Sequence, residues 1–299
     1  MLNIGEIAEQ PAPAMAGDGP EKLSARRTSR FRKYRKVAAA RMLLEKSPTG
    51  KALLKLARHL KITIVPDPQL KTAGVFYPGE NKIAINPSHS AADMATTLVH
   101  ELRHAWQDQH EISEGPTLTP RDYILMVRAT EADAEAISVL VGWELKQAGH
   151  GEVLAAHLES SYGDISRKFL NEMAASGNLK MALRSAYDQW FAKHGRIDGY
   201  NSDGIRNMEE RLDDHIDAMR AKEVFPLSNS ELHRLGEMPL GGNYLNTRPS
   251  RNLLSPEYRA HISPAHEKRL CDLEIQIGLR KPPPPPRPLF TPPYRPMPR

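Results

Sequence analysis

The amino-acid sequence predicts an α+β fold that is mostly helical, with a small antiparallel sheet packed on one long helix. Short runs of β-branched and aromatic residues are confined to residues 62–86, whereas helical periodicity recurs through most of the remaining chain. The two ends differ from this body. Residues 1–21 are rich in Ala, Pro, Gly and acidic residues, and residues 280–299 contain a polyproline run. We therefore expect both ends to be disordered.

These patterns divide the chain into consecutive segments. They are a disordered N-terminus (1–21), a basic helical arm (22–61), a central domain (62–225), a C-terminal extension that packs on this domain (226–279) and a proline-rich disordered tail (280–299). A chain of 299 residues is long enough for one sizeable core with such appendages.

The composition restricts the class of protein. Cys271 is the single cysteine, so neither a disulfide framework nor a cysteine-rich zinc site is expected, and a reducing compartment fits. No apolar run approaches about 18 residues, which predicts no spanning helix and no membrane partner. The N-terminal residues are acidic where a secretory signal is positively charged. We expect a cytoplasmic protein, and export by a route without a cleaved signal stays open.

Positive charge is concentrated in the arm. Residues 22–61 contain 14 Lys and Arg and a single acid, Glu45, whereas the rest of the chain contains 27 basic and 35 acidic residues. Apolar residues at helical spacing predict two helices between Ser24 and Leu60, separated by residues 47–50. Such an arm can bind nucleic acid or an acidic surface, but no recognised reading motif accompanies its charge. The alternative is a solvated helix that docks on the acidic body of the protein.

Residues 62–86 predict the sheet. Residues 62–65 form a short β run that Pro66 ends. Residues 74–77 and 82–86 flank a Pro-Gly turn and predict an antiparallel hairpin. The weak alternation of 82–86 is typical of an edge strand with one covered face.

Helices account for the chain after the hairpin. Ser90 followed by Asp93 predicts a capped helix over 91–109, and a second long helix is expected over 121–147. Further helices are predicted over 153–161, 165–175, 179–194, 205–224 and 264–277. Apart from the last of these, helical signals fade beyond Pro226.

The helix over 91–109 contains a pattern typical of metal chemistry. His100, Glu101 and His104 form an HExxH motif in the stretch TTLVHELRHAWQDQH. Residues four apart share a helix face, so both imidazoles can bind one Zn²⁺, and the adjacent carboxylate can act as general base on a zinc-activated water. The alternative is a helix with two solvated histidines. We favour the metal site because the helix is otherwise apolar, capped and preceded by a hairpin.

Such a site needs a third protein ligand, and the helix over 121–147 offers one. Glu131 is the preferred candidate, because two antiparallel helices can bring its carboxylate to the histidines. Glu135 lies one turn further on the same face, where it is expected to orient His100 or His104 without binding the metal.

Three other residues stay open as the third ligand, namely Asp133, Glu135 and His110. Asp133 points away from the face of Glu131 on a regular helix. His110 stands six residues after the second histidine, a spacing that requires the chain to turn back at a glycine, and no glycine occurs before Gly115. We therefore place all three behind Glu131.

The motifs together resemble a known group of peptidases. The hairpin GVFYPGENKIAINP, the helix TTLVHELRHAWQ and the later EADA are similar to bacterial metallopeptidase domains of the compact gluzincin type, and more distantly to the ImmA/IrrE peptidases. The resemblance covers roughly residues 60–150 and implies a zincin-like metallopeptidase domain within 62–225. It also implies that strand 82–86 binds an extended peptide by strand addition. The site residues it implies are three ligands of one Zn²⁺ and a catalytic base: His100, His104 and Glu131 with Glu101.

A peptidase of this kind also needs a donor for the developing oxyanion. Tyr244 follows a flexible glycine pair in GGNYLN and is the candidate for this role, with an ordinary loop tyrosine as the alternative. The predicted function is zinc-dependent hydrolysis of peptide bonds in a peptide or protein substrate. Two alternatives stay open: a nucleic-acid-associated regulatory protein acting through residues 22–61, and a non-catalytic interaction protein or effector with a zincin fold.

Overall fold

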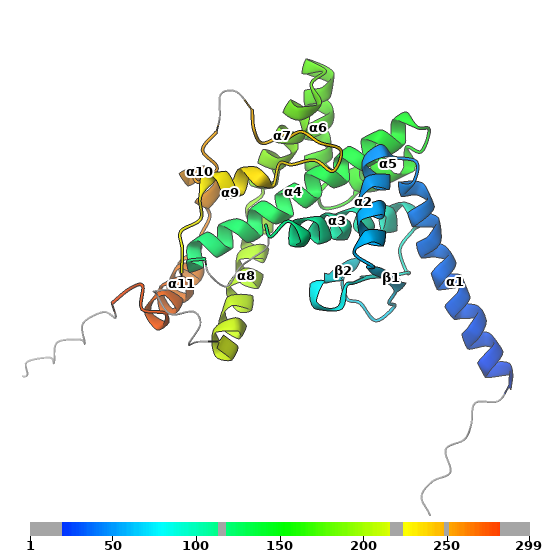
Figure 1. The fold of residues 1–299 in the computed structure, drawn as a ribbon, viewed down its shortest axis with the longest axis horizontal. Coiled ribbons are helices and arrows are strands. Elements are labelled where there is room, and N and C mark those ends of the chain that lie inside the picture. The colour runs from blue at the N-terminus through cyan, green and yellow to red at the C-terminus, as the bar shows by residue number, and fades with distance from the viewer. Residues whose placement is uncertain (1–19, 113–117, 216–223, 248–250, 282–299) are drawn as a thin grey trace, which may run out of the picture.

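The computed structural model describes residues 20–112, 118–215, 224–247 and 251–281. Most of this chain is helical, and the sheet is small (Figure 1). The two ends predicted to be disordered lie outside the described residues, except for residues 20–21 and 280–281.

The arm forms two helices, as predicted. Helix α1 (Pro20–Leu44) ends before Ser47, whose side chain accepts a hydrogen bond from the Gly50 amide and caps α2 (Pro48–His59). The same turn is tied to the centre of the molecule, because Ser47 and Thr49 both donate hydrogen bonds to the Glu144 carboxylate. The break between the helices is therefore an anchored corner.

The sheet differs from the prediction in one respect. Its strands are β1 (Thr63–Pro66), β2 (Gly74–Tyr77) and β3 (Lys82–Ile85), with a 3-10 turn η1 (Pro78–Glu80) inside the hairpin. The antiparallel hairpin β2–β3 is confirmed, but β1 pairs with β3 in parallel, so the sheet is mixed.

Strand β3 is the centre of the sheet and not its edge, because the strand order is β1-β3-β2. Ile83, Ala84 and Ile85 are consecutive buried residues, at 0%, 1% and 1% exposure. A strand covered on both faces loses its polar alternation, which explains why the alternation is weak. The expectation of an edge strand at 82–86 is wrong, and β2 is the edge strand on that side.

Two long helices form the middle of the molecule. Helix α3 (Ala91–Gln109) begins with a capping box between Ser90 and Asp93, and its bounds agree with the prediction. Helix α4 (Pro120–Gln147) begins at a proline after the capping residue Thr119 and is buried over most of its length. The two helices pack against each other, and β2 and β3 pack on α3 (Figure 1).

The remaining helices follow α4 in the chain. They are α5 (Glu152–Glu159), α6 (Gly163–Ser176), α7 (Leu179–Trp190), α8 (His194–His215), α9 (Asn229–Arg234), α10 (Pro256–Arg259) and α11 (Pro264–Gln276). Of these, α5, α6, α7, α8 and α11 contact α4. Helix α8 begins well before the predicted residue 205, because the glycines that suggest a loop lie inside it. At Gly204 a Cβ would lie 2.8 Å from Ile124 of α4, so a residue without a side chain permits this close approach.

A single hydrophobic cluster runs through the described chain. It includes Val37 of α1, the apolar faces of α3 and α4, and Leu270 of α11, so the arm and the C-terminal extension share the core of the central domain. Among the described residues, the helices are too short or too polar to cross a bilayer.

Candidate metal centre

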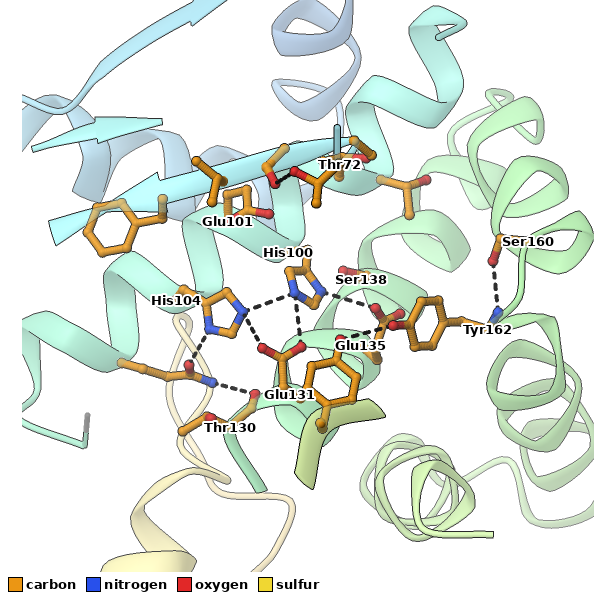
Figure 2. Close-up of a pocket in the computed structure, with 18 of the residues that line it drawn as sticks. Thr72, His100, Glu101, His104, Thr130, Glu131, Glu135, Ser138, Ser160 and Tyr162 are labelled. Atoms are coloured by element: carbon orange, nitrogen blue, oxygen red, sulfur yellow. Dashed lines mark hydrogen bonds and ion pairs between the residues drawn. The ribbon is translucent and has the colours of Figure 1, made fainter. Parts of the chain in front are cut away.

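Helices α3 and α4 bring the predicted ligands together. His100 and His104 occupy successive turns of one face of α3, and Glu131 projects toward them from α4 (Figure 2). One ligand atom of each residue lies within 4.8 Å of the other two. Among the described residues, this is the group of His, Cys, Asp and Glu side chains with the spacing of a metal site.

The donor atoms point at a common centre. His100 Nε2 and His104 Nε2 are 2.9 Å apart. The Glu131 carboxylate faces both, with Oε2 at 3.4 Å from His100 Nε2 and Oε1 at 3.3 Å from His104 Nε2. Oε2 is buried and has no hydrogen-bond partner among the described residues. A buried carboxylate oxygen without such a partner is expected where a cation binds.

Hydrogen bonds on the opposite side of each ring determine which nitrogen is free. His100 Nδ1 lies 3.1 Å from Glu135 Oε1, and His104 Nδ1 lies 2.8 Å from Gln107 Oε1. Both partners are acceptors, so each Nδ1 carries the proton and each Nε2 directs its lone pair inward. Two lone pairs 2.9 Å apart repel unless a positive charge lies between them.

The electrostatics of the site agree with this requirement. Burial opposes a charged imidazolium, yet Glu131 and Glu135 outweigh it and raise the pKa of His100 well above its usual value. Burial likewise opposes a charged His104, and Glu131 raises its pKa. Burial would raise the pKa of Glu131, but the two histidines lower it. The site therefore stabilises positive charge, and two imidazoles with one carboxylate form a donor set that suits a divalent transition metal.

Glu101 lies beside this centre on the side of β2. Its side chain is 7% exposed, and burial raises its pKa although His100 and His104 act in the opposite direction. A backbone hydrogen bond from Phe76 holds it. A carboxylate with a raised pKa next to a metal centre is suited to exchanging protons near neutral pH.

The site opens into a cavity of about 870 Å³. One wall consists of the edge strand β2 and the residues just before it, from Thr72 to Phe76. Other lining residues are 160–162 after α5, together with Tyr200, Asn207 and Arg211 of α8. A cavity of this volume is within the range of ligand-binding sites in proteins.

Glu135 lies behind His100. Its Oε1 faces His100 Nδ1, and its Oε2 accepts from His157 Nε2 at 2.9 Å. Burial would raise the pKa of Glu135, but the hydrogen bonds to His100 and His157 lower it to about 2. Ser166 completes the chain at 2.7 Å from His157 Nδ1. Glu135 therefore contacts a predicted ligand and lies where a residue that orients it is expected.

The other two candidates for the third ligand lie elsewhere. Asp133 is fully buried in an ion pair with Arg103, whose Nε lies 2.6 Å from Oδ2. His110 is the C-cap of α3, where its Nδ1 contacts the Trp106 carbonyl at 2.7 Å and its ring stacks on Trp106. Neither side chain belongs to the group whose spacing could hold a metal ion.

The position of Tyr244 does not match the oxyanion role expected of it. Its side chain is 0% exposed, it is not among the residues that line the cavity, and its hydroxyl donates to Asp133 Oδ1 at 2.8 Å. The glycine pair before it forms a tight turn that folds residues 243–245 into the core. The tyrosines that line the cavity are Tyr162 and Tyr200, whose hydroxyl groups are 2.9 Å apart.

Sequence reasoning missed Tyr162, Tyr200 and His157, since no motif marks these three positions. They reach the site through the packing of α5, α6 and α8 around α4. Gln107 carried a signal that could have been used. It lies three residues after His104, on the same face of α3, where an amide can reach the imidazole.

Comparison with known proteins gives one result. A family model described as "Putative metallopeptidase family (DUF6782)" matches residues 20–246. No curated protein and no solved structure matches the chain. The matched range includes both helices of the metal centre, the sheet and the arm. It lends no support to nucleic-acid binding by residues 22–61.

Proposed function

The chain belongs to this metallopeptidase family, and from that premise we propose that it is a zinc-dependent hydrolase of peptide bonds, with Glu101 as the general base. One observation carries the proposal. One ligand atom each of His100, His104 and Glu131 lies within 4.8 Å of the other two, next to the buried Glu101. Both rings are oriented by acceptors at Nδ1. Glu131 Oε2 has no hydrogen-bond partner among the described residues. The finer assignment, a compact gluzincin with zincin packing and a distant likeness to the ImmA/IrrE peptidases, is part of the proposal.

Zinc is the metal that suits this donor set best. His100, His104 and Glu131, which line the cavity, would hold it. When bound, zinc supplies Lewis acidity and lowers the pKa of water to about 7. The cysteine-free site excludes a thiolate ligand within the described centre, since Cys271 lies on α11.

Glu101 would move the proton in this reaction. Its raised pKa allows the carboxylate to accept a proton from the attacking water and to release it to the leaving amine. Glu101 lines the cavity beside β2, so a peptide bound there would lie close to its carboxylate. General acid–base catalysis of this kind contributes about 10²–10⁴-fold to the rate.

Tyr162 and Tyr200 replace Tyr244 as candidates for the oxyanion donor. Burial and the nearby glutamates raise the pKa of both hydroxyl groups, so both stay protonated and can donate. Because one hydroxyl donates to the other at 2.9 Å, one O–H of the pair is left for a ligand in the cavity. In Figure 2 Tyr162 lies on the side of Glu135, away from Glu101.

The edge strand β2 is the proposed docking site for the substrate backbone. Its inner side pairs with β3, and the strand borders the cavity next to Glu101. An extended peptide can add to such an edge as a further strand. Gly74 lets β2 approach α3 closely, since a Cβ there would lie 2.5 Å from Thr97 Cγ2. We propose a peptide or protein substrate on this strand, and a cytoplasmic location for the reaction.

The test compares Glu101→Gln with Glu257→Gln. Glu257 is an exposed glutamate on α10 that does not line the cavity, so it is a matched control. Zinc content is measured by elemental analysis, and hydrolysis by mass spectrometry of a mixture of unstructured peptides. Glu101→Gln should retain one zinc per chain and lose activity by about 10²–10⁴-fold. Glu257→Gln should match the wild type in both. A folded wild-type chain that takes up no zinc, or a Glu101→Gln variant with full activity, would refute the proposal.

A further inference from the structure

A buried polar cluster next to the metal centre has no part in the proposed chemistry. It consists of Arg103, Gln107, Asp133 and Tyr244, whose side chains are between 0% and 2% exposed. We call it the Arg103 cluster. Asp133 accepts four hydrogen bonds: two from Arg103 at 2.6 and 3.0 Å, one from Gln107 at 2.7 Å and one from Tyr244 at 2.8 Å. The carboxylate is therefore saturated and fixed in place.

The saturated carboxylate determines how the Gln107 amide is turned. Gln107 Nε2 donates to Asp133 Oδ2 at 2.7 Å and to the Thr130 carbonyl at 2.9 Å. A flipped amide would place its oxygen against two acceptors, which is unfavourable in a buried site. Oε1 must therefore face the opposite way, toward His104 Nδ1 at 2.8 Å.

The amide in turn selects the tautomer of His104. An oxygen accepts a hydrogen bond only from a protonated nitrogen, so Nδ1 carries the proton and Nε2 keeps its lone pair. That lone pair faces His100 Nε2 and Glu131, where the ligands converge. The other tautomer would lose the Gln107 hydrogen bond and would direct an N–H at the metal position.

We propose that Gln107 is a positioning residue that fixes His104 in its metal-binding tautomer, and that the Arg103 cluster holds the amide in that orientation. The inference rests on the proposed function for the identity of the metal. It assigns a role to Asp133 and Tyr244, which do not themselves touch the site. The ligand it concerns is a divalent zinc ion.

The cluster also connects the metal centre to a distant part of the chain. Arg103 Nη2 donates to the carbonyl oxygens of Leu235 and Glu237 at 2.6 and 2.8 Å, and Tyr244 follows on the same segment. Residues 235–244 thus supply three of the groups that hold Arg103 and Asp133. Metal affinity should therefore depend on a tyrosine that is remote from the ligands and outside the cavity.

The test measures zinc affinity by competition with a chromophoric chelator, using Zn²⁺ alone as the probe. Gln107→Met keeps the size of the side chain and removes both its acceptor and its donors, and it should weaken zinc binding by about 10–100-fold. Tyr244→Phe removes a single hydrogen bond to Asp133 and should weaken binding by about three- to tenfold. Gln109→Met, at the exposed end of α3, is the matched control and should bind as the wild type does.

A second measurement separates positioning from general loss of structure. In zinc-loaded protein labelled with ¹⁵N-histidine, the His104 Nδ1–H proton should be visible, because Gln107 protects it from exchange with water. It should disappear in Gln107→Met while the His100 Nδ1–H signal, protected by Glu135, persists. Loss of the His104 signal alone supports positioning.

The outcomes that overturn the inference differ from those that overturn the proposed function. A wild-type chain that binds no zinc refutes both. If the wild type binds zinc and Gln107→Met binds it equally tightly with an unchanged His104 signal, only the positioning role is refuted. If Gln107→Met does not fold, the zinc affinity of Tyr244→Phe tests the proposal instead. A folded Tyr244→Phe that binds zinc as tightly as the wild type contradicts the role of the Arg103 cluster.

Discussion

At the scale of single residues, the direction of each hydrogen bond determines what the metal centre can do. Glu135 and Gln107 present acceptors to the two Nδ1 atoms, and this leaves both Nε2 atoms as lone-pair donors. Glu131 then completes the set with an oxygen that has no hydrogen-bond partner among the described residues. The proposed ligand set therefore depends on where acceptors lie behind the rings as much as on the HExxH spacing.

The assignment of the third ligand can be tested directly. Glu131→Ala should weaken zinc binding by more than about 100-fold, since even a residue that only supports a ligand contributes 10–100-fold. His110→Ala is the control, because it removes a histidine from the end of the same helix without touching the ligands. Chelator competition gives both affinities. Tight binding by Glu131→Ala, together with loss of binding in Glu135→Ala, would show that Glu135 is the ligand.

The tyrosine pair gives a prediction about turnover. Tyr162→Phe/Tyr200→Phe removes the proposed oxyanion donor and should lower kcat by about 10²–10³-fold while KM changes little. Tyr187→Phe is the control, because that buried hydroxyl has no hydrogen-bond partner among the described residues and lies outside the cavity lining. Steady-state kinetics on a peptide cleaved by the wild type measure both constants. An equal rise in KM with unchanged kcat would assign the pair to substrate binding instead.

At the scale of elements, the cavity depends on where a helix begins. Helix α6 begins at Gly163, directly after Tyr162, and a Cβ at this glycine would lie 2.0 Å from the Leu158 carbonyl oxygen. The contact joins the last turn of α5 to the first residue of α6, and residues 160–162 between them line the cavity. A residue without a side chain is therefore required where the wall turns.

This requirement predicts a contrast between two glycines. Gly163→Ala should lower the free energy of unfolding by about 1–3 kcal/mol, because the backbone must move to relieve the clash. Gly199→Ala, inside α8 with no atom within 4 Å of the added Cβ, should raise it by about 0.5–1 kcal/mol. Chemical denaturation of each variant measures the change. Equal stability of Gly163→Ala and the wild type would contradict the described turn.

At the scale of the whole molecule, the arm and the C-terminal extension behave as parts of one body. Leu44 at the end of α1 and Leu270 in α11 are both 0% exposed and belong to the same hydrophobic cluster as α3 and α4. Arg121 of α4 adds ion pairs to Glu267 and Glu274 of α11 at 2.7 Å each. Segments far apart in the sequence therefore contribute to a single core.

A single core predicts a single unfolding transition. Leu44→Ala should lower the stability of the entire molecule by about 2–5 kcal/mol, because it leaves a cavity in the shared cluster. Met42→Ala, two residues away and 68% exposed, should change it by less than about 0.5 kcal/mol. Denaturation followed by fluorescence and by circular dichroism should give coincident curves. If Leu44→Ala affects only a separate early transition, the arm is an independent unit.

The sequence by itself determined the local features of this protein. The capping box at Ser90 and Asp93 predicted where α3 begins, and HExxH placed His100, Glu101 and His104 within five consecutive residues of that helix. The β2–β3 hairpin followed from its turn residues. These features depend on residues two to four positions apart, whose geometry the backbone period dictates.

Only the tertiary structure decided the rest. The parallel pairing of β1 made β3 central and β2 the edge, and the burial of Tyr244 against Asp133 left Tyr162 and Tyr200 to line the cavity. Such contacts join residues far apart in the sequence, as in the bonds from Arg103 to residues 235 and 237, which lie 132 and 134 positions away. Their formation depends on which faces pack together, and no short-range pattern in the chain encodes that choice.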